Sequence, residues 1–233
     1  MSNLSQLRLA VQSKLGLETT ASGTEETLVD AWLNQGVIDV LLQTHCNVNS
    51  ATMTLTSGTS DYTLDTGILA LLDVTYQAAS SSTTNAVERT TPADILRMRQ
   101  QGVSSSPVRY YALNGHDLLM VYPTPSSSSD TLTTYYVPRP TAMSATGNDP
   151  SAETYGGIPA EYHKAIEYYA LWQGGDYDDD SSSNIGAEYR RTYLELIREF
   201  KRYVRRKGGR SLGRARVGRR PLVPHDNSQD VGW

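Results

Sequence analysis

The residues best suited to chemistry in this chain are arginines and lysines gathered near its C-terminus. Thirteen of the 21 Lys and Arg lie between Arg190 and Arg220, where the only acidic residues are Glu195 and Glu199. That segment carries a net charge of +11, whereas the rest of the chain carries −15. Because local field rather than net charge governs long-range attraction, a basic segment on an acidic body is suited to binding a second macromolecule.

We expect the end of this segment to act as a binding arm. Residues 208–233 have no helical or strand periodicity, which predicts disorder in isolation. Arginines spaced by Gly and Ser could follow the phosphates of a nucleic acid without reading its bases. Alternatively, they could bind an acidic protein surface, with the apolar residues as anchors. The candidate binding residues are Arg205, Arg206, Lys207, Arg210, Arg214, Arg216, Arg219, Arg220, Leu222, Val223 and Trp233.

Groupings that could bind a metal are incomplete. Asp176, Asp178 and Asp180 have the one-three-five spacing that opens a calcium loop. However, Ser181 stands where that loop requires glycine, and Ala187 where it requires a bidentate glutamate. The histidines are scattered, and no two have metal-ligand spacing: His45, His116, His163 and His225. We therefore expect no metal site.

Catalytic patterns are equally weak. Glu161 and Glu167 are a carboxylate pair by residue type, and they could serve glycoside hydrolysis only if the fold brings them together. The sequence contains no glycine-rich phosphate loop, nucleophile elbow or zinc-peptidase helix. The single Cys46 excludes an intramolecular disulfide. We expect a protein that is not an enzyme, uses no cofactor and has no contact with a membrane.

The spacing of apolar residues predicts helices at both ends of the chain. Leu4, Leu7, Val11 and Leu15 predict a short amphipathic helix, and a second helix should begin near Thr24. Two further helices are expected after Pro159 and after Ser183; the first should close at Gly174-Gly175 and the second at Gly208-Gly209.

The middle of the chain predicts strands instead. Alternating residues favour strands near Met53, Tyr62 and Ile68, and Thr91-Pro92 is a strong helix start. Residues 108–138 are typical of an antiparallel meander, with a hairpin at Asn114-Gly115. Fifteen Tyr against one Phe suggest surfaces that become buried on assembly.

Together these patterns predict an α+β fold with five parts. A helical bundle should form from residues 1–48 and 158–207. Residues 49–140 should form a small inserted antiparallel β module with one short helix. Residues 141–157 should be a linker, and residues 208–233 an extended basic arm.

The order of these elements resembles the head–tail adaptor, or connector, proteins of tailed bacteriophages. The resemblance covers most of residues 24–206, and no single stretch carries it alone. The stretches that carry it are Leu28–Val37, Ser60–Leu64, Ser106–Gly115, Leu118–Pro125, Leu132–Pro138 and Ile158–Ile166 with Tyr168–Trp172. The long basic arm departs from many members of that family.

The resemblance implies a structural virion protein at the neck, assembled in the host cytoplasm. Such proteins form a homo-oligomeric ring, usually of twelve copies, that docks under the portal and receives the tail or the next neck protein. Double-stranded DNA passes through the central channel during ejection. In such a ring, an arm that binds portal is a better interpretation than an arm that binds DNA, because tight binding to the DNA phosphates would slow the passage of DNA. A peptidoglycan-degrading virion enzyme and a DNA-binding accessory protein remain as alternatives.

Overall fold

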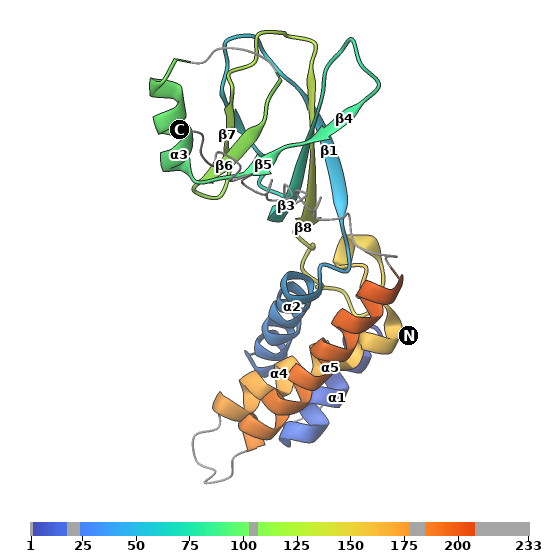
Figure 1. Ribbon diagram of the computed structural model, residues 1–233. Helices are drawn as coiled ribbons and strands as arrows, with labels where there is room; N and C mark the ends of the chain where they lie inside the picture. The colour runs from blue at the N-terminus through green and yellow to red at the C-terminus, as the bar shows by residue number, and fades with distance from the viewer. Residues whose placement is uncertain (1, 18–23, 103–106, 178–184, 208–233) are drawn as a thin grey trace, which may run out of the picture.

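The computed structural model describes residues 2–17, 24–102, 107–177 and 185–207, and it has an α+β architecture as expected. Four helices occupy one end of the molecule, and the strands occupy the other together with the short helix α3 (Figure 1). The helical end contains α1 (Leu4–Leu15), α2 (Thr24–Thr44), α4 (His163–Tyr177) and α5 (Ile185–Lys207). Since these helices come from both ends of the chain, the strands between them form an insertion.

Local sequence determines where the first helix starts and stops. The Asn3 side chain accepts a hydrogen bond from the backbone N–H of Gln6, and the Gln6 side chain accepts one from Asn3 in return. This reciprocal cap satisfies donors that the helix leaves unpaired. Gly16 ends the helix in a left-handed conformation, with φ 70°. The predicted boundaries of α1 are therefore confirmed.

The helices share one apolar core. Leu4, Leu7 and Val11 of α1 are buried against the apolar stripe of α2 and the small and branched residues of α4. Phe200 contributes from α5 and is fully buried. Each large apolar side chain that is buried stabilises the folded state by roughly 1.5–3 kcal/mol. This core therefore holds the helices from the two ends of the chain together.

The strands form two four-stranded sheets in the described part of the chain. The first sheet has the order β1-β8-β3-β4, and the second has the order β2-β7-β6-β5. The first contains β1 (Asn49–Thr54), β8 (Thr131–Pro138), β3 (Ile68–Gln77) and β4 (Thr84–Ala86). The second contains β2 (Asp61–Thr63), β7 (Leu118–Tyr122), β6 (Tyr110–Asn114) and β5 (Glu88–Arg89), with α3 (Pro92–Gln100) packed on β6 and β7.

The prediction of one meander over residues 108–138 is wrong. Strands β6 and β7 do form the hairpin expected at Asn114-Gly115, but β8 leaves that sheet and pairs with β1 and β3. In addition, β5 and β6 pair in parallel, so the module is not purely antiparallel. The apolar residues of both sheets face one shared core, which includes Val74, Tyr76, Leu119 and Leu132. Crossing to the first sheet lets β8 close that core from the other side.

Two glycines expected to end a helix instead allow helices to approach each other. Helix α4 continues past Gly174 and Gly175 to Tyr177. A Cβ at Gly174 would lie 2.4 Å from Leu15 Cδ1, and one at Gly175 would lie 3.0 Å from the Cα of Gly186 in α5. The glycines are therefore needed for close packing with α1 and α5, and not for termination. The start of the same helix is also altered, because residues Ala160–Tyr162 form a 3₁₀ turn before α4 begins.

The described residues contain no helix that is both long enough and apolar enough to span a membrane.

Candidate protein-binding surface

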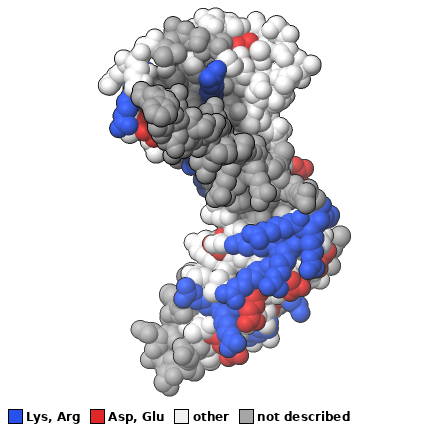
Figure 2. Space-filling view, viewed as in Figure 1, with Lys and Arg blue, Asp and Glu red and all other residues white. Residues whose placement is uncertain are grey.

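Helix α5 presents the most basic surface of the described structure. It carries eight Lys and Arg residues and three Glu. Figure 2 shows the blue side chains gathered over the part of the helical end where α5 runs in Figure 1. One face of the helix packs Tyr193, Ile197 and Phe200 into the core. The charged residues lie on the opposite face, as expected for an amphipathic helix with 3.6 residues per turn.

A shallow open groove of about 550 Å³ lies along this basic face. Arg198, Arg202 and Arg206 recur every four residues, so they lie along one side of the helix. All three side chains are exposed. The groove is lined by Tyr162, Glu195, Arg198, Glu199, Arg202, Tyr203 and Arg206.

Aromatic rings form the floor of the groove. Tyr162, from the turn before α4, stacks on Phe200 with ring centroids 4.0 Å apart and an interplanar angle of 8°. Its ring also lies 5.2 Å from that of Tyr203. Burial, with a further contribution from the Glu199 carboxylate, raises the pKa of Tyr162 above its usual value. The phenol therefore stays neutral, and it combines an apolar ring with a hydroxyl group that can form hydrogen bonds.

The cations of the groove are largely free for a partner. Arg191, which does not line the groove, is paired with Glu195 at 3.4 Å, one turn away on the same helix. In the part of the chain that the structure describes, Arg198, Arg202 and Arg206 form no ion pair. Arg205, Arg206 and Lys207 occupy the last turn, where their charges favour the negative end of the helix dipole. The ammonium of Lys207 lies 5.5 Å from the centre of the Tyr203 ring.

Contacts with α2 and α4 hold the basic helix in place. The Tyr193 hydroxyl donates to the carboxylate of Asp39 on α2, and Lys201 Nζ donates to Gln43 Oε1 at 2.9 Å. Burial, together with that carboxylate, strongly raises the pKa of Tyr193. The guanidinium of Arg190 lies 5.2 Å from the Trp172 ring of α4. The groove is thus built on a rigid element and not on a loop.

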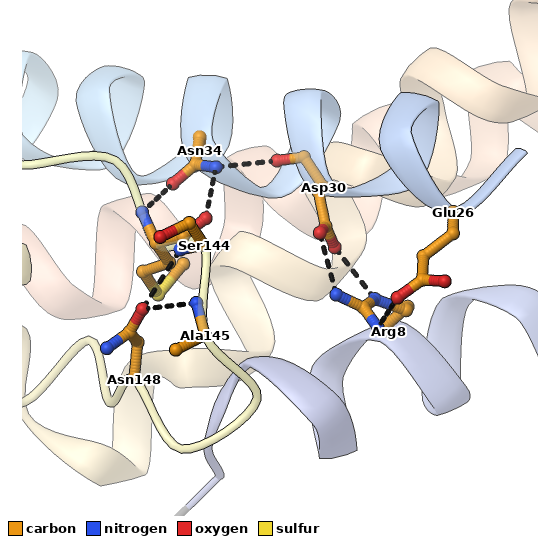
Figure 3. Close-up of polar contacts among 8 residues, drawn as sticks. Arg8, Glu26, Asp30, Asn34, Ser144, Ala145 and Asn148 are labelled. Carbon is orange, nitrogen blue, oxygen red and sulfur yellow. Dashed lines mark hydrogen bonds and ion pairs between the residues drawn. The ribbon is translucent and has the colours of Figure 1, made fainter. Parts of the chain in front are cut away.

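A second set of polar contacts holds α1, α2 and the segment before α4 together (Figure 3). Arg8 of α1 donates to the carboxylates of both Glu26 and Asp30 on α2. One turn further along α2, Asn34 donates to the carbonyl of Met143 at 3.1 Å and accepts from its N–H at 2.7 Å. These contacts tie residues 141–157, expected to be a linker, onto the helices.

The same segment also anchors the start of α1. Asn148 Oδ1 accepts hydrogen bonds from the backbone N–H groups of Ser144 and Ala145 (Figure 3). The backbone N–H of Leu4 donates to the carbonyl of Asn148 at 2.8 Å, and that of Ser5 donates to the carbonyl of Thr146 at 3.3 Å. These hydrogen bonds give acceptors to backbone N–H groups in the first turn of α1, which have no partner within the helix.

The structure describes only part of the predicted binding arm. Arg205, Arg206 and Lys207 are exposed on the last turn of α5. Two groove cations, Arg198 and Arg202, were not among the predicted binding residues, although their four-residue spacing is visible in the sequence. The predicted residues Arg210, Arg214, Arg216, Arg219, Arg220, Leu222, Val223 and Trp233 lie outside the described residues.

The carboxylate pair that hydrolysis would need is not assembled. Glu167 of α4 is paired with Lys14 of α1 at 2.5 Å, whereas Glu161 is exposed in the preceding turn. Six residues of a helical path place the two side chains roughly 120° apart around its axis. No cluster of His, Cys, Asp and Glu suited to a metal occurs in the described ranges. Of the three aspartates with calcium-loop spacing, where no metal site is expected, Asp178 and Asp180 lie outside those ranges.

His163 is buried, and its ring nitrogens contact the polypeptide backbone. It is the first residue of α4 and is 1% exposed, not at the surface. Its Nδ1 lies 3.1 Å from the carbonyl oxygen of Ser2, and its Nε2 lies 3.0 Å from that of Ile158. The imidazole therefore joins the N-terminal segment to the start of α4.

The groove is a candidate docking surface on a helical end joined to a β module, and the described residues place no catalytic constellation beside it. No protein with a curated description matches the chain. The family model described as SU10 adaptor protein matches residues 2–220, which cover most of the chain and all of its described elements. The chain therefore belongs to the SU10 adaptor protein family, a family of phage head–tail adaptors.

Proposed function

We propose that this adaptor forms a ring, of twelve copies, beneath the portal in the neck of the virion. The ring joins the portal to the tail or to the next neck protein, and it surrounds the channel through which DNA leaves. The observation that carries this proposal is the family match over residues 2–220, combined with a basic groove on α5. The role is mechanical, and assembly takes place in the host cytoplasm.

The α5 groove and the residues that follow it form the portal-binding surface in this proposal. Arg198, Arg202 and Arg206 are exposed and unpaired within the described residues, so binding costs them no existing ion pair. Arginine and tyrosine are the residue types that most often dominate protein interfaces. The groove combines both on a helix that the core holds rigid, which lowers the entropy lost on binding.

An acidic protein surface fits this groove better than a nucleic acid does. Glu195 and Glu199 lie among its arginines and would repel phosphates at close range. Against a protein, the same carboxylates can pair with basic residues and fix the register of docking. The aromatic floor of Tyr162 and Tyr203 supplies apolar area as well.

A binding assay on the full chain and on a chain ending at Lys207 tests the proposal. Binding to purified portal should weaken strongly on truncation, and affinity should depend only modestly on salt. Duplex DNA should bind weakly to both proteins. Tight DNA binding that falls steeply with salt would instead support the DNA-binding alternative. A full chain that never binds portal would contradict the proposal.

A further inference from the structure

The two sheets of the β module differ in how their edges are protected. Edge strands normally carry charges, prolines, bulges or covering elements, because their unpaired backbone groups can recruit another chain. The second sheet follows this rule. Its edge strand β2 contains Asp61, whose carboxylate is paired with Arg99 of α3 at 2.6 Å. Its other edge, β5, is only Glu88–Arg89, so both of its residues are charged.

Within the described residues, neither edge strand of the first sheet is protected by a charge or a proline, although β4 is short. Strands β1 (Asn49–Thr54) and β4 (Thr84–Ala86) contain no charged residue and no proline. The β1 register against β8 runs from Asn49 to Thr54 without a bulge. Thr52, Thr54 and all three residues of β4 are exposed. Across all four strands of this sheet the one charged residue is Asp73.

Strand directions make the two bare edges complementary. Neighbouring strands in the order β1-β8-β3-β4 are all antiparallel, so β1 and β4 run in opposite directions. A second copy in the same orientation can therefore place its β1 beside β4 and continue the antiparallel pattern. Cyclic symmetry gives every copy of a ring that common orientation, and it requires two different surfaces that fit each other.

We infer that β1 of one copy pairs with β4 of the next, so that the first sheet continues from subunit to subunit around the ring. This inference rests on the proposed ring. A two-fold contact between two β1 strands would leave the β4 edge bare, whereas head-to-tail pairing uses both edges in every copy. Uncharged threonine-rich strands also avoid repulsion when many copies meet.

Register within the sheet identifies residues for cross-linking. Thr54 lies in one row with Thr131, Gln77 and Thr84, and Thr52 lies in the next outward-facing row with Thr133, Thr75 and Ala86. Thr52, Thr54, Thr84 and Ala86 thus share the same face of the sheet, and all four are exposed. Cysteines facing each other across paired strands lie within disulfide range.

The test pairs one cysteine on each edge in a Cys46→Ala background. Each of Thr52→Cys and Thr54→Cys is combined with each of Thr84→Cys and Ala86→Cys, so a register shift cannot hide the contact. The chains are oxidised with copper phenanthroline, alone at high concentration and bound to portal. At least one combination should give a ladder of covalent multimers on a non-reducing gel. A mixture of the two corresponding single variants should stop at dimers.

Three outcomes would overturn the inference. A β1 single variant that dimerises by itself as efficiently as the mixture would show two-fold pairing. A β4 single variant that does so would show the same for the other edge. Absence of a ladder in every combination, both free and on portal, would exclude edge pairing. If portal still binds in that case, the proposed function stands without this contact, so the two failures are distinguishable.

A charge on the edge provides an independent check. Thr52→Lys and Asn85→Lys place the residue that natural edges use for protection on β1 and β4. Each should abolish the ladder of a cross-linking variant while portal binding by the single copy is retained. Thr66→Lys, at an exposed turn outside both sheets, is the matched control and should leave the ladder intact. A full ladder in the Thr52→Lys and Asn85→Lys proteins would count against the inference.

Discussion

Arg8 of α1 holds Asp30 of α2 through two parallel hydrogen bonds, from Nε to Oδ1 at 2.8 Å and from Nη2 to Oδ2 at 2.7 Å. The Arg8 side chain is 12% exposed, so this fork is shielded from water. Hydrogen bonding to Asp30 raises the pKa of the guanidinium above its ordinary value. Together with the contact between Arg8 and Glu26, the pair joins the two N-terminal helices through one arginine.

Replacing this arginine should test the strength of the fork. Arg8→Met leaves the carboxylates of Asp30 and Glu26 without their cation, and we expect a loss of about 2–4 kcal/mol in the free energy of unfolding. Arg8→Lys keeps the charge but not the fork, so its loss should be smaller. Urea denaturation measures both. The double variant Arg8→Met/Asp30→Leu should recover part of the loss, and no recovery would mean that packing is responsible.

Helix packing at Gly175 gives a second prediction. A Cβ there would lie 3.0 Å from the Cα of Gly186, a backbone atom that cannot rotate away. Gly175→Ala should therefore destabilise the helical end by roughly 1–3 kcal/mol, although alanine favours helix formation. Thermal unfolding measures the change. Gly147→Ala is the control, because a Cβ at Gly147 would have open space within 4 Å; equal effects from both substitutions would refute the packing argument.

Asp130 provides a prediction about acid stability. Its carboxylate accepts hydrogen bonds from the Tyr76 hydroxyl at 2.6 Å and from the Ala79 N–H at 3.0 Å, and the first of these chiefly lowers the pKa of Asp130. A carboxyl with a lowered pKa in the folded state contributes stability above its unfolded pKa of about 3.9. That contribution is lost as pH falls through the folded value.

Asp130→Asn should expose this contribution in a series of urea denaturations from pH 7 to pH 3. We expect it to lower the free energy of unfolding by about 1–3 kcal/mol at pH 7 and to flatten the decline in stability below pH 5. Glu161→Gln, at an exposed carboxylate, should change neither quantity. If the free energy of unfolding of the Asp130→Asn protein declines below pH 5 as steeply as that of the unsubstituted protein, this carboxylate does not govern acid unfolding.

Local signals in the sequence predicted individual elements well. Thr91 caps α3 as expected, with Oγ1 accepting a hydrogen bond from the Asp94 N–H at 3.2 Å, because both partners lie three residues apart. The α1 helix and the Asn114-Gly115 hairpin were also correct for this reason. Capping and turn preferences act over a few residues, so one sequence is enough to read them.

Contacts between distant segments were not predictable in the same way. The crossing of β8 to the first sheet depends on which core it completes, and its own alternation fits either sheet. Gly174-Gly175 has the composition of a helix stop, and only the approach of α1 and α5 explains its place within α4. Likewise, the groove needed Tyr162, which lies more than thirty residues before the arginines that surround it.

The α5 groove gives the prediction most directly tied to the proposed function. Arg198→Gln combined with Arg202→Gln removes two exposed cations from the groove and disturbs no ion pair among the described residues. Because both side chains are exposed, the free energy of unfolding should change by less than about 0.5 kcal/mol. Affinity for portal should fall about tenfold, which corresponds to ~1.4 kcal/mol. Surface plasmon resonance on immobilised portal measures this change.

Arg191→Gln is the matched control for that measurement. Arg191 lies on the same helix and is exposed, but it is already paired with Glu195 and does not line the groove. Its substitution should change portal affinity less than about twofold, because a surface ion pair of this kind contributes little. If the double variant and Arg191→Gln weaken binding equally, the effect reflects the overall charge of α5, and the groove is not the contact. If neither weakens it, portal binding depends on other residues.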